Sequence, residues 1–379
     1  MNNRKIKILL IQTSPLTYGG VEKYASCLID AILIHNNKFS VEVLSPYECT
    51  NDAYREKLNK LNIPLYELGL NFSVGTGAKK LTRATKEFYK EHNDFDIVHV
   101  NSGSKIAMAK LAYISKKMLN AKVLLHSHCS IDNITLSKKI LRWIFSFPIN
   151  KYADYLLACS REASVAQFVN KVQDKVVICN NGVDVEKFLP DNNVRQEYRK
   201  RLDINQDDFV IGHIGRFTYQ KNQIFLVEVF REIISQHKNS KLLLIGEGED
   251  LESVKKKVKE YKLQNEVIFL KEITDIQNYM QVMDVFVMPS TFEGLPIVAV
   301  EAQAAGLPLI LSDSISKETK LTKNVTFVSL DNSKSQWAKL ILSLKGYEKE
   351  DNTINIKNRG FSIPSCYDVV LNLYSNSAC

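Results

Sequence analysis

The chain has 379 residues, more than one hydrophobic core ordinarily organises, so two domains are expected. Hydrophobic residues make up 45% and charged residues 24%, which excludes a disordered or fibrous class. The net charge is +8, and residues 1–172 alone hold 24 Lys and Arg against 14 Asp and Glu, so the whole excess lies in the first half. This excess indicates either an ordinary solvated surface or attraction to an anionic partner.

Other global features narrow the function class. No DNA- or RNA-binding motif accompanies the basic half, so lipid is favoured over nucleic acid as an anionic partner. No apolar run approaches the roughly 18 residues of a membrane span. The opening apolar stretch, ILLI, is too short for a signal peptide and predicts a buried strand instead. Seven cysteines without paired spacing indicate free thiols and a reducing, cytoplasmic location.

Short apolar runs alternate with longer helical patterns along the chain. Two series of five strands are expected, at KIKILLIQT, SVEVLS, DIVHVN, AKVLLHSH and YLLACS, and then at DFVIGHIG, KLLLIGEG, EVIFLK, DVFVMPS and LPLILS. Continuous apolar strands alternating with helices predict parallel sheets covered on both faces. The predicted fold class is therefore α/β, with two doubly wound, Rossmann-like domains. We place them at 1–172 and 173–357, followed by a helical tail at 358–379 that could pack on either domain and that we group with the first.

The first loop of interest follows the first strand. Gly19 and Gly20 open the next helical pattern, where a glycine pair either makes a common turn or lets the backbone approach an anion at a helix N-terminus. Asp94 and Asp96 form the one Asp-x-Asp of the chain, but they precede a strand. Ligands in open α/β sheets bind beyond the carboxyl ends of strands, so we interpret these two residues as part of a turn.

Two further features lie in the first half. His126 and His128 stand two apart at a strand end, which predicts that their side chains share a face. They could be structural or ligate a metal, although no third metal ligand is near. The helical stretch LSKKILRWIFSFPINKY then mixes cations with aromatic residues. Such a helix either packs its aromatic residues into the core or contacts a membrane surface, and its residues of interest are Lys138, Lys139, Arg142, Lys151, Trp143, Phe145 and Phe147.

The second series of strands is followed by cations. Arg216 and Lys221 lie just past DFVIGHIG, five residues apart. They are either surface cations or a clamp for a diphosphate, with the guanidinium forking onto two oxygens and the ammonium acting as a point charge.

The segment STFEGLPIVAVEAQAAGLP predicts a helix that begins near Pro296 and ends at Gly306. The N–H groups around Leu295 would then be unpaired donors at the positive end of the helix, which is an anion site. Gly294 would let the backbone approach the ligand closely.

This segment also carries two carboxylates. Glu293 precedes the helix, and Glu301 lies inside it among small apolar residues. Because helical side chains lean toward the N-terminus, the Glu301 carboxylate would point back toward the helix start. It could accept hydrogen bonds from ribose hydroxyls or form an internal ion pair.

Three segments, GRFTYQKN, PSTFEGLPIVAVEAQAAGLP and NNGVD, together resemble the family-four retaining glycosyltransferases. Those enzymes have the GT-B fold, in which two Rossmann-like domains face each other across a cleft. The first two segments are similar to the branch that makes capsular polysaccharide and exopolysaccharide. The resemblance covers nearly the whole chain and is most specific over residues 210–313.

The resemblance implies roles for individual residues. Arg216 and Lys221 would bind the donor diphosphate, and Glu301 would hold the ribose. Glu293, with the backbone of Gly294 and Leu295, would hold the donor sugar and phosphate. The first domain would face the acceptor. There the Gly20 loop would touch the donor phosphate and the acceptor, and His128 would contact the donor sugar near its anomeric carbon. His128 and Glu293 are thus the expected catalytic residues.

The implied activity is retaining transfer of a sugar from a nucleoside diphosphate sugar, a UDP-sugar in our interpretation, to a lipid-linked or saccharide acceptor. We expect no metal and no other cofactor, because Arg216, Lys221 and the helix N-terminus would neutralise the leaving diphosphate. The expected location is the cytoplasm, with peripheral contact at the anionic inner face of the membrane.

Two departures from the family pattern concern the donor. Asn222 stands where a glycine often follows the lysine, and Lys271 stands where a glycine often approaches the nucleobase.

Other classes of protein remain open at this point. A glycoside hydrolase could use Glu293 and Glu301, but it would not need the anion clamp. A nucleotide-sugar epimerase could share the architecture without transferring the sugar. A dinucleotide oxidoreductase would require a third glycine in GEGEDL. A non-catalytic membrane scaffold would keep the basic first half without needing Glu301.

Overall fold

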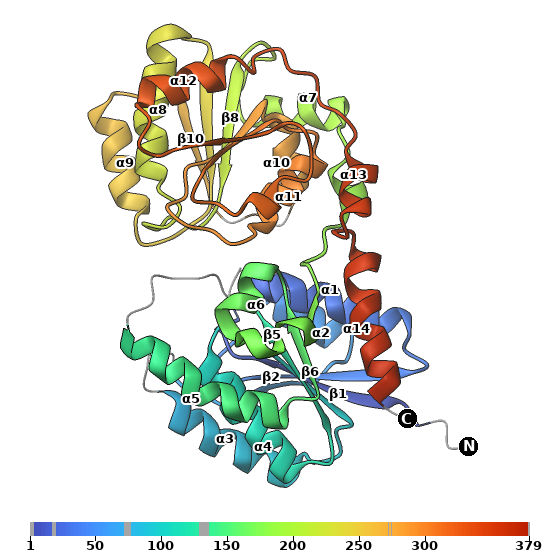
Figure 1. Cartoon of the computed structure of the whole chain (residues 1–379). Helices are drawn as coiled ribbons and strands as arrows, with labels where there is room; N and C mark the ends of the chain where they lie inside the picture. Colours follow the sequence, from blue (N-terminus) through green and yellow to red (C-terminus); the bar gives the residue numbers. More distant parts are fainter. Residues whose placement is uncertain are drawn as a thin grey trace. The chain divides into compact units, whose positions relative to one another are not determined.

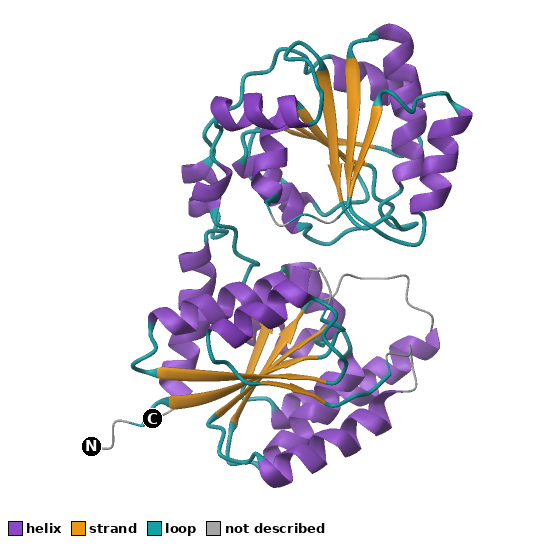
Figure 2. Cartoon of the chain, turned by 180° about the vertical axis from the view of Figure 1, so that it is seen from behind, coloured by secondary structure: helices purple, strands orange, loops and turns teal. Residues whose placement is uncertain are grey.

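The computed structural model describes residues 4–16, 20–71, 77–128, 136–271, 273 and 275–377. Internal contacts divide the chain into two compact bodies. Unit 1 comprises Met1–Gly182 and Ile363–Cys379, and unit 2 comprises Val183–Ser362. Each has a parallel sheet with helices on both faces (Figures 1 and 2).

Unit 1 contains a seven-stranded parallel sheet in the order β3-β2-β1-β4-β5-β6-β7. Its central strands are apolar and fully buried, as expected for a sheet covered on both sides. The strands are β1 (Ile6–Gln12), β2 (Phe39–Ser45), β3 (Leu65–Glu67), β4 (Ile97–Ser102), β5 (Lys122–Ser127), β6 (Tyr155–Ala158) and β7 (Val176–Ile178).

The helices of unit 1 form two layers. One core lies beneath α1 (Gly20–Ile34), α2 (Asp52–Lys60) and α14 (Ile363–Ser377). The other lies beneath α3 (Gly77–Glu91), α4 (Lys105–Met118) and α5 (Leu136–Tyr152). The short α6 (Arg161–Gln167) and the 3₁₀ helix Asn170–Lys175 lead into β7.

The last helix, α14, packs against α1. The rings of Tyr367 and Tyr24 lie 5.4 Å apart, and the Tyr367 hydroxyl donates to the Tyr24 carbonyl oxygen at 3.3 Å. Farther along α14, the hydroxyl of Tyr374 lies 2.5 Å from Nδ1 of His99 in β4. The final helix therefore completes one covering layer of the unit 1 sheet.

Unit 2 contains a six-stranded parallel sheet in the order β10-β9-β8-β11-β12-β13. Its strands are β8 (Phe209–Ile214), β9 (Ser240–Ile245), β10 (Val267–Leu270), β11 (Val285–Met288), β12 (Leu309–Ser312) and β13 (Val325–Val328).

The unit 2 sheet is also covered on both faces. One core contains residues of α8 (Gln223–Gln236), α9 (Leu251–Glu260) and α12 (Lys334–Leu342). The opposite core contains residues of α7 (Asn192–Arg201), α10 (Ile276–Val282), α11 (Ile297–Ala304), α13 (Thr353–Asn358) and the 3₁₀ helix Val185–Phe188. A short 3₁₀ helix, Lys317–Thr319, follows β12.

All ten expected strands are present, and the helix before Gly306 ends as expected. Gly306 has φ +72°, the left-handed conformation that commonly follows a helix. α11 begins at Ile297, next to the expected start near Pro296, and Pro296 is its N-cap with ψ 115°. Proline has no backbone N–H to donate, so the N-cap suits it as well as the first turn would.

Candidate donor-binding site

The candidate site residues of unit 2 follow neighbouring strands. β8 pairs with β9 on one side and with β11 on the other, so the direction of winding reverses between β8 and β11. Ligands of open α/β sheets bind at the carboxyl ends of the strands at such a switch point. The loop after β8 carries Arg216 and Lys221, and the loop after β11 carries Glu293.

The structure brings Lys221 and Glu293 into direct contact. Lys221 Nζ lies 2.6 Å from Glu293 Oε1, and the two side chains are only 17% and 12% exposed. A close ion pair with little water around it is stronger than an exposed one. The pair places one cation and one hydrogen-bond acceptor side by side, just before the start of α11.

Backbone contacts hold the two loops together. The N–H of Thr291 donates to the carbonyl of Gln220 at 2.8 Å, and the Gln220 side chain donates to the carbonyl of Phe292 at 3.0 Å. Asn222 has φ +57°, a conformation that asparagine tolerates better than most residues, and its side chain donates to the Pro289 carbonyl at 3.2 Å. This contact gives a structural reason for asparagine at 222.

Glu293 is also fixed from its other side. Its backbone forms a bridge with Ile315, and the N–H of Ser316 donates to the Glu293 carbonyl at 3.1 Å. The backbone of Glu293 is therefore held by the loop after β12, and its carboxylate is paired with Lys221.

The helix that follows, α11, presents its N-terminus at this position. Pro296 supplies no side-chain acceptor to the first turn. First-turn N–H groups without a side-chain cap are suited to an anionic ligand. Glu301 lies within α11 and is 3% exposed, so its carboxylate is buried. Gln303 anchors the same helix by donating to the Thr319 carbonyl at 2.8 Å.

Arg216 differs from Lys221 in its surroundings. Its side chain is 71% exposed, and its guanidinium lies 3.6 Å from the Glu249 carboxylate. An exposed pair at this distance constrains the side chain weakly, so the guanidinium is free to turn toward a ligand.

Two glycines shape the backbone beneath Arg216. A Cβ on Gly246 would lie 2.3 Å from the Gly215 carbonyl oxygen, and one on Gly248 would lie 2.2 Å from that of Phe217. Both glycines have positive φ, of 142° and 153°. The glycines of GEGEDL therefore let two loops pack closely.

A histidine that sequence reasoning missed supports the same loop. His213 is fully buried in β8, donates from Nδ1 to the Val287 carbonyl at 2.8 Å, and accepts from the Gln223 side chain at 3.2 Å. Gln223 also donates to the Arg216 carbonyl at 3.0 Å. Burial lowers the pKa of His213 to about 4, so the ring stays neutral and keeps this arrangement. In the sequence it looks like any residue of a buried strand.

In unit 1 the two predicted histidines do share a face. The rings of His126 and His128 lie 4.1 Å apart, and Tyr24 contacts both at 4.8 Å. His128 Nε2 donates to Asn101 Oδ1 at 2.9 Å, and burial lowers the pKa of His128 to about 3. The ring is therefore neutral, and its Nδ1 has no hydrogen-bond partner among the described residues. This nitrogen is a potential acceptor for a hydroxyl.

The other predicted positions of unit 1 are placed as follows. Gly20 is the first residue of α1, whereas Gly19 lies outside the described residues. Asp94 and Asp96 precede β4, as expected for a turn. Lys7 contacts Asp94 at 2.8 Å and Arg4 contacts Asp96 at 3.2 Å.

The region expected to meet the nucleobase is described in part. Lys271 is 87% exposed and lies 3.9 Å from Glu247, but positions 272 and 274 of FLKEITD are outside the described residues. Among the residues that are described, no three His, Cys, Asp or Glu side chains gather as a metal site would require.

Comparison with known proteins decides the family. The model of the glycosyl transferases group 1 matches residues 194–359, and the model of glycosyltransferase family 4 matches residues 18–187. The chain belongs to the family 4 glycosyltransferases. Like the rest of that family it is an enzyme of the GT-B fold, which confirms the resemblance and the fold class predicted from the sequence.

Relatives and solved structures extend over nearly the full chain of this glycosyltransferase. EpsF of Bacillus subtilis, named as a glycosyltransferase, is 29% identical over 348 residues, which cover 90% of this chain and 88% of EpsF. The UDP-Gal:alpha-D-GlcNAc-diphosphoundecaprenol alpha-1,3-galactosyltransferase of Escherichia coli is 29% identical over 84% of this chain and 82% of its own. Anabaena Alr3699/HepE, solved in complex with UDP-glucose, has a TM-score of 0.74, with 19% identity over 98% of this chain and 99% of its own.

Proposed function

We propose that this glycosyltransferase moves a sugar from a UDP-sugar to a lipid-linked saccharide during synthesis of a cell-surface polysaccharide. The observation that carries the donor half is the contact of Lys221 with Glu293 at the switch point, beside the N-terminus of α11. A diphosphate needs cations and N–H donors, and a sugar needs a carboxylate acceptor. The UDP-glucose bound by the Anabaena structure supports uridine as the base.

In the proposed reaction, the bond between the anomeric carbon and the diphosphate oxygen breaks, and a bond to the acceptor hydroxyl oxygen forms on the same face. The hydroxyl proton passes to a phosphate oxygen of the departing UDP. Arg216, Lys221 and the N-terminus of α11 stabilise the negative charge on UDP. Glu293 holds the sugar together with the Gly294 and Leu295 backbone.

The remaining assignments complete the proposed site. Glu301 accepts from the ribose hydroxyls, and the Gly20 loop contributes backbone N–H groups at the start of α1. His128 contacts the reacting sugar with a neutral imidazole, whose buried Nδ1 has no hydrogen-bond partner among the described residues. Because cations and N–H groups neutralise the diphosphate in this scheme, we expect activity to persist in the presence of chelators.

The acceptor half rests on relatives and on charge. The E. coli relative is named for an undecaprenol-linked acceptor, and the basic charge of this chain is concentrated in unit 1. Lipid-linked acceptors are held at membranes, so we propose that the enzyme works at the cytoplasmic face.

Donor binding is tested by thermal unfolding of the purified enzyme with a panel of UDP-, GDP- and ADP-sugars. A UDP-sugar should raise the Tm, because a ligand that binds only the folded state stabilises it. Glu301→Ala and the closer mimic Glu301→Gln should abolish this rise, and Arg216→Ala should weaken it. Glu252→Ala, a change of a highly exposed glutamate on α9, should leave the rise unchanged. Wild-type protection in both Glu301 variants would refute the donor site.

Transfer is tested with the donor that binds and a GlcNAc-diphosphoundecaprenol acceptor, the type named for the E. coli relative. A glycosylated lipid product whose NMR spectrum shows the donor's anomeric configuration is expected. Epimerised donor without transfer would indicate an epimerase. Release of free sugar from aryl glycosides without nucleotide would indicate a hydrolase.

A further inference from the structure

One layer of unit 1 carries all of its excess charge. Helices α3, α4 and α5 lie side by side over one face of the sheet (Figure 1). Their sequences hold 13 lysines and arginines and two glutamates, a formal charge of +11. Unit 1 as a whole has 25 basic and 16 acidic residues, so everything outside this layer sums to −2. The excess positive charge of unit 1 therefore lies in the sequences of these three helices.

The same layer exposes large apolar side chains. Trp143 is 75% exposed, Phe147 70% and Ile144 51%, all on α5. Trp143 and Phe147 are one helical turn apart, which puts both rings on one stripe. Phe145 and Ile149 of the same helix pack into the core instead. The aromatic residues predicted on this helix thus divide between core and surface, and those on the surface have no structural role in the sheet packing.

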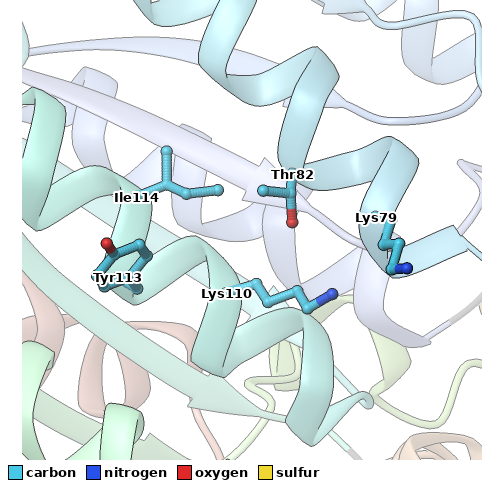
Figure 3. A pocket seen from close by; sticks show the side chains of 5 residues that line it. All are labelled: Lys79, Thr82, Lys110, Tyr113 and Ile114. Carbon is cyan, nitrogen blue, oxygen red and sulfur yellow. The ribbon is translucent and has the colours of Figure 1, made fainter.

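Cations and apolar groups are interleaved across the layer. Lys151 Nζ lies 5.8 Å from the Phe147 ring centre. A shallow hollow is lined by residues of α3 and α4, with the ammonium groups of Lys79 and Lys110 at one end and Tyr113 and Ile114 at the other (Figure 3). For residues 136–142 of α5 only the backbone is described, which leaves out the side chains of Lys138, Lys139 and Arg142.

The hollow is continuous with α5. The ring of Tyr113, which is 43% exposed, lies 5.2 Å from that of Tyr152, the last residue of α5. Aromatic rings among lysines suit the boundary between phospholipid headgroups and acyl chains, where the rings enter the apolar zone and the ammonium groups meet phosphate. No helix in the described part of the chain is long and apolar enough to cross a bilayer.

We propose that the α3–α4–α5 layer docks on an anionic phospholipid bilayer, with Trp143 and Phe147 entering the headgroup–acyl boundary and the lysines facing lipid phosphates. This surface is separate from the residues assigned to the sugar donor. Docking would bring the enzyme to a membrane-held acceptor, yet it requires neither donor nor acceptor. Its test can therefore fail while the proposed transfer stands, and the reverse also holds.

The chain carries its own reporter for this docking. It has two tryptophans, Trp143 on the proposed surface and Trp337, which is 0% exposed inside unit 2. With phosphatidylcholine vesicles containing phosphatidylglycerol, tryptophan emission should shift to shorter wavelength and be quenched by lipids brominated near the headgroup. Trp143→Phe should remove the shift but keep co-sedimentation. A shift that persists in Trp143→Phe would overturn the proposed orientation.

Paired variants separate the two contributions in vesicle co-sedimentation. Trp143→Ser with Phe147→Ser should weaken binding about tenfold by removing the inserted rings. Lys79→Glu with Lys110→Glu should weaken it by a similar factor and reduce its sensitivity to salt. The matched controls lie on the opposite layer. Ile34→Ser changes an apolar residue on α1 that is 78% exposed, and Lys60→Glu changes an exposed lysine on α2. Both control variants should bind vesicles as the wild type does.

Three outcomes would overturn the proposal. The first is wild-type binding by both double variants. The second is equal binding to vesicles of phosphatidylcholine alone, because it would remove the anionic requirement. The third is that the protein does not bind vesicles and instead forms a dimer, which the Trp143 and Phe147 changes dissociate. In that case a second copy of the chain, rather than a membrane, would cover this surface. Circular dichroism melts of each variant confirm that the fold is retained.

Discussion

The two units share a winding order but differ in the chemistry at their strand ends. In unit 1 the carboxyl ends of β4 and β5 hold neutral groups, Asn101 and two histidines whose pKa values are lowered by burial. In unit 2 the ends of β8 and β11 hold a close ion pair, Lys221 with Glu293. Neutral donors and acceptors suit hydroxyl groups, whereas a cation beside a helix N-terminus suits phosphate. We propose from this contrast that one sheet topology serves two ligand chemistries through the residues at its strand ends.

The largest expected effect on activity comes from removing Lys221, the cation of the unit 2 ion pair. Lys221→Ala should lower kcat/KM by about 10³-fold, because in the proposed reaction the charge that develops on the leaving diphosphate loses its buried partner. Consumption of UDP-sugar in the presence of acceptor measures this. Lys323→Ala, a change of a lysine that is 74% exposed elsewhere in unit 2, should retain full activity. If Lys221→Ala loses less than tenfold, the charge-based contrast between the units is wrong.

The pair also has a stability signature. In Lys221→Ala the carboxylate of Glu293 is left without its ion-pair partner, which should destabilise the protein by about 1–3 kcal/mol. Lys221→Ala combined with Glu293→Ala should recover part of that stability while remaining inactive. Urea unfolding of both variants checks the coupling.

The next effect concerns the glycine contacts beneath Arg216. Gly248→Ala should destabilise unit 2 by about 2–4 kcal/mol, because the added Cβ would lie 2.2 Å from the Phe217 carbonyl oxygen at a φ of 153°. Gly346→Ala is the matched control. It also has positive φ, but nothing lies within 4 Å of its Cβ, so it should cost only about 1 kcal/mol. Urea unfolding followed by Trp337 fluorescence reports on unit 2. Equal costs for the two changes would show that the loop relaxes.

A pH experiment compares the units directly. Burial lowers the pKa of His99 and His128 to about 3 and that of His126 well below its usual range, while unit 2 has His213 at about 4. Unfolded imidazoles bind protons below about pH 6.5, so the unfolded state takes up more protons than the folded one. Stability should therefore fall as the pH drops from 6.5 toward 4, and more steeply in unit 1.

Hydrogen exchange resolves the two units in that experiment. Peptides from α4 should lose protection at higher pH than peptides from α8. His128→Asn, which keeps a neutral polar side chain, should reduce the pH dependence of the α4 peptides without changing that of α8. Identical pH dependence in the two units would remove the distinction between them.

What the sequence could predict follows from how each element is stabilised. Long buried strands such as β1 and β8 were predictable because their sequences are continuous apolar runs. The strands β3, β7 and β13 were not among the ten expected strands. They have only three or four residues, and their formation depends on pairing with neighbouring strands rather than on their own sequence pattern. The position of Arg216, Lys221 and Glu293 in loops after strands was predictable from the strand pattern, and their roles in donor binding stay predictions. The contact of Lys221 with Glu293 was not, because it depends on how two loops meet in space.

The smallest expected effect on stability concerns Arg216. It contrasts this exposed cation with Lys221, the buried cation of the same unit. The pair of Arg216 with Glu249 spans 3.6 Å between side chains that are 71% and 64% exposed, so Glu249→Gln should change stability by less than about 1 kcal/mol. Arg216→Ala should be equally harmless to folding but should raise the KM for the UDP-sugar about tenfold, since a guanidinium binds two phosphate oxygens at once. Arg216→Lys should recover only part of that affinity, because an ammonium cannot form the fork. If Lys restores the full affinity, Arg216 acts as a point charge, and bidentate recognition is wrong.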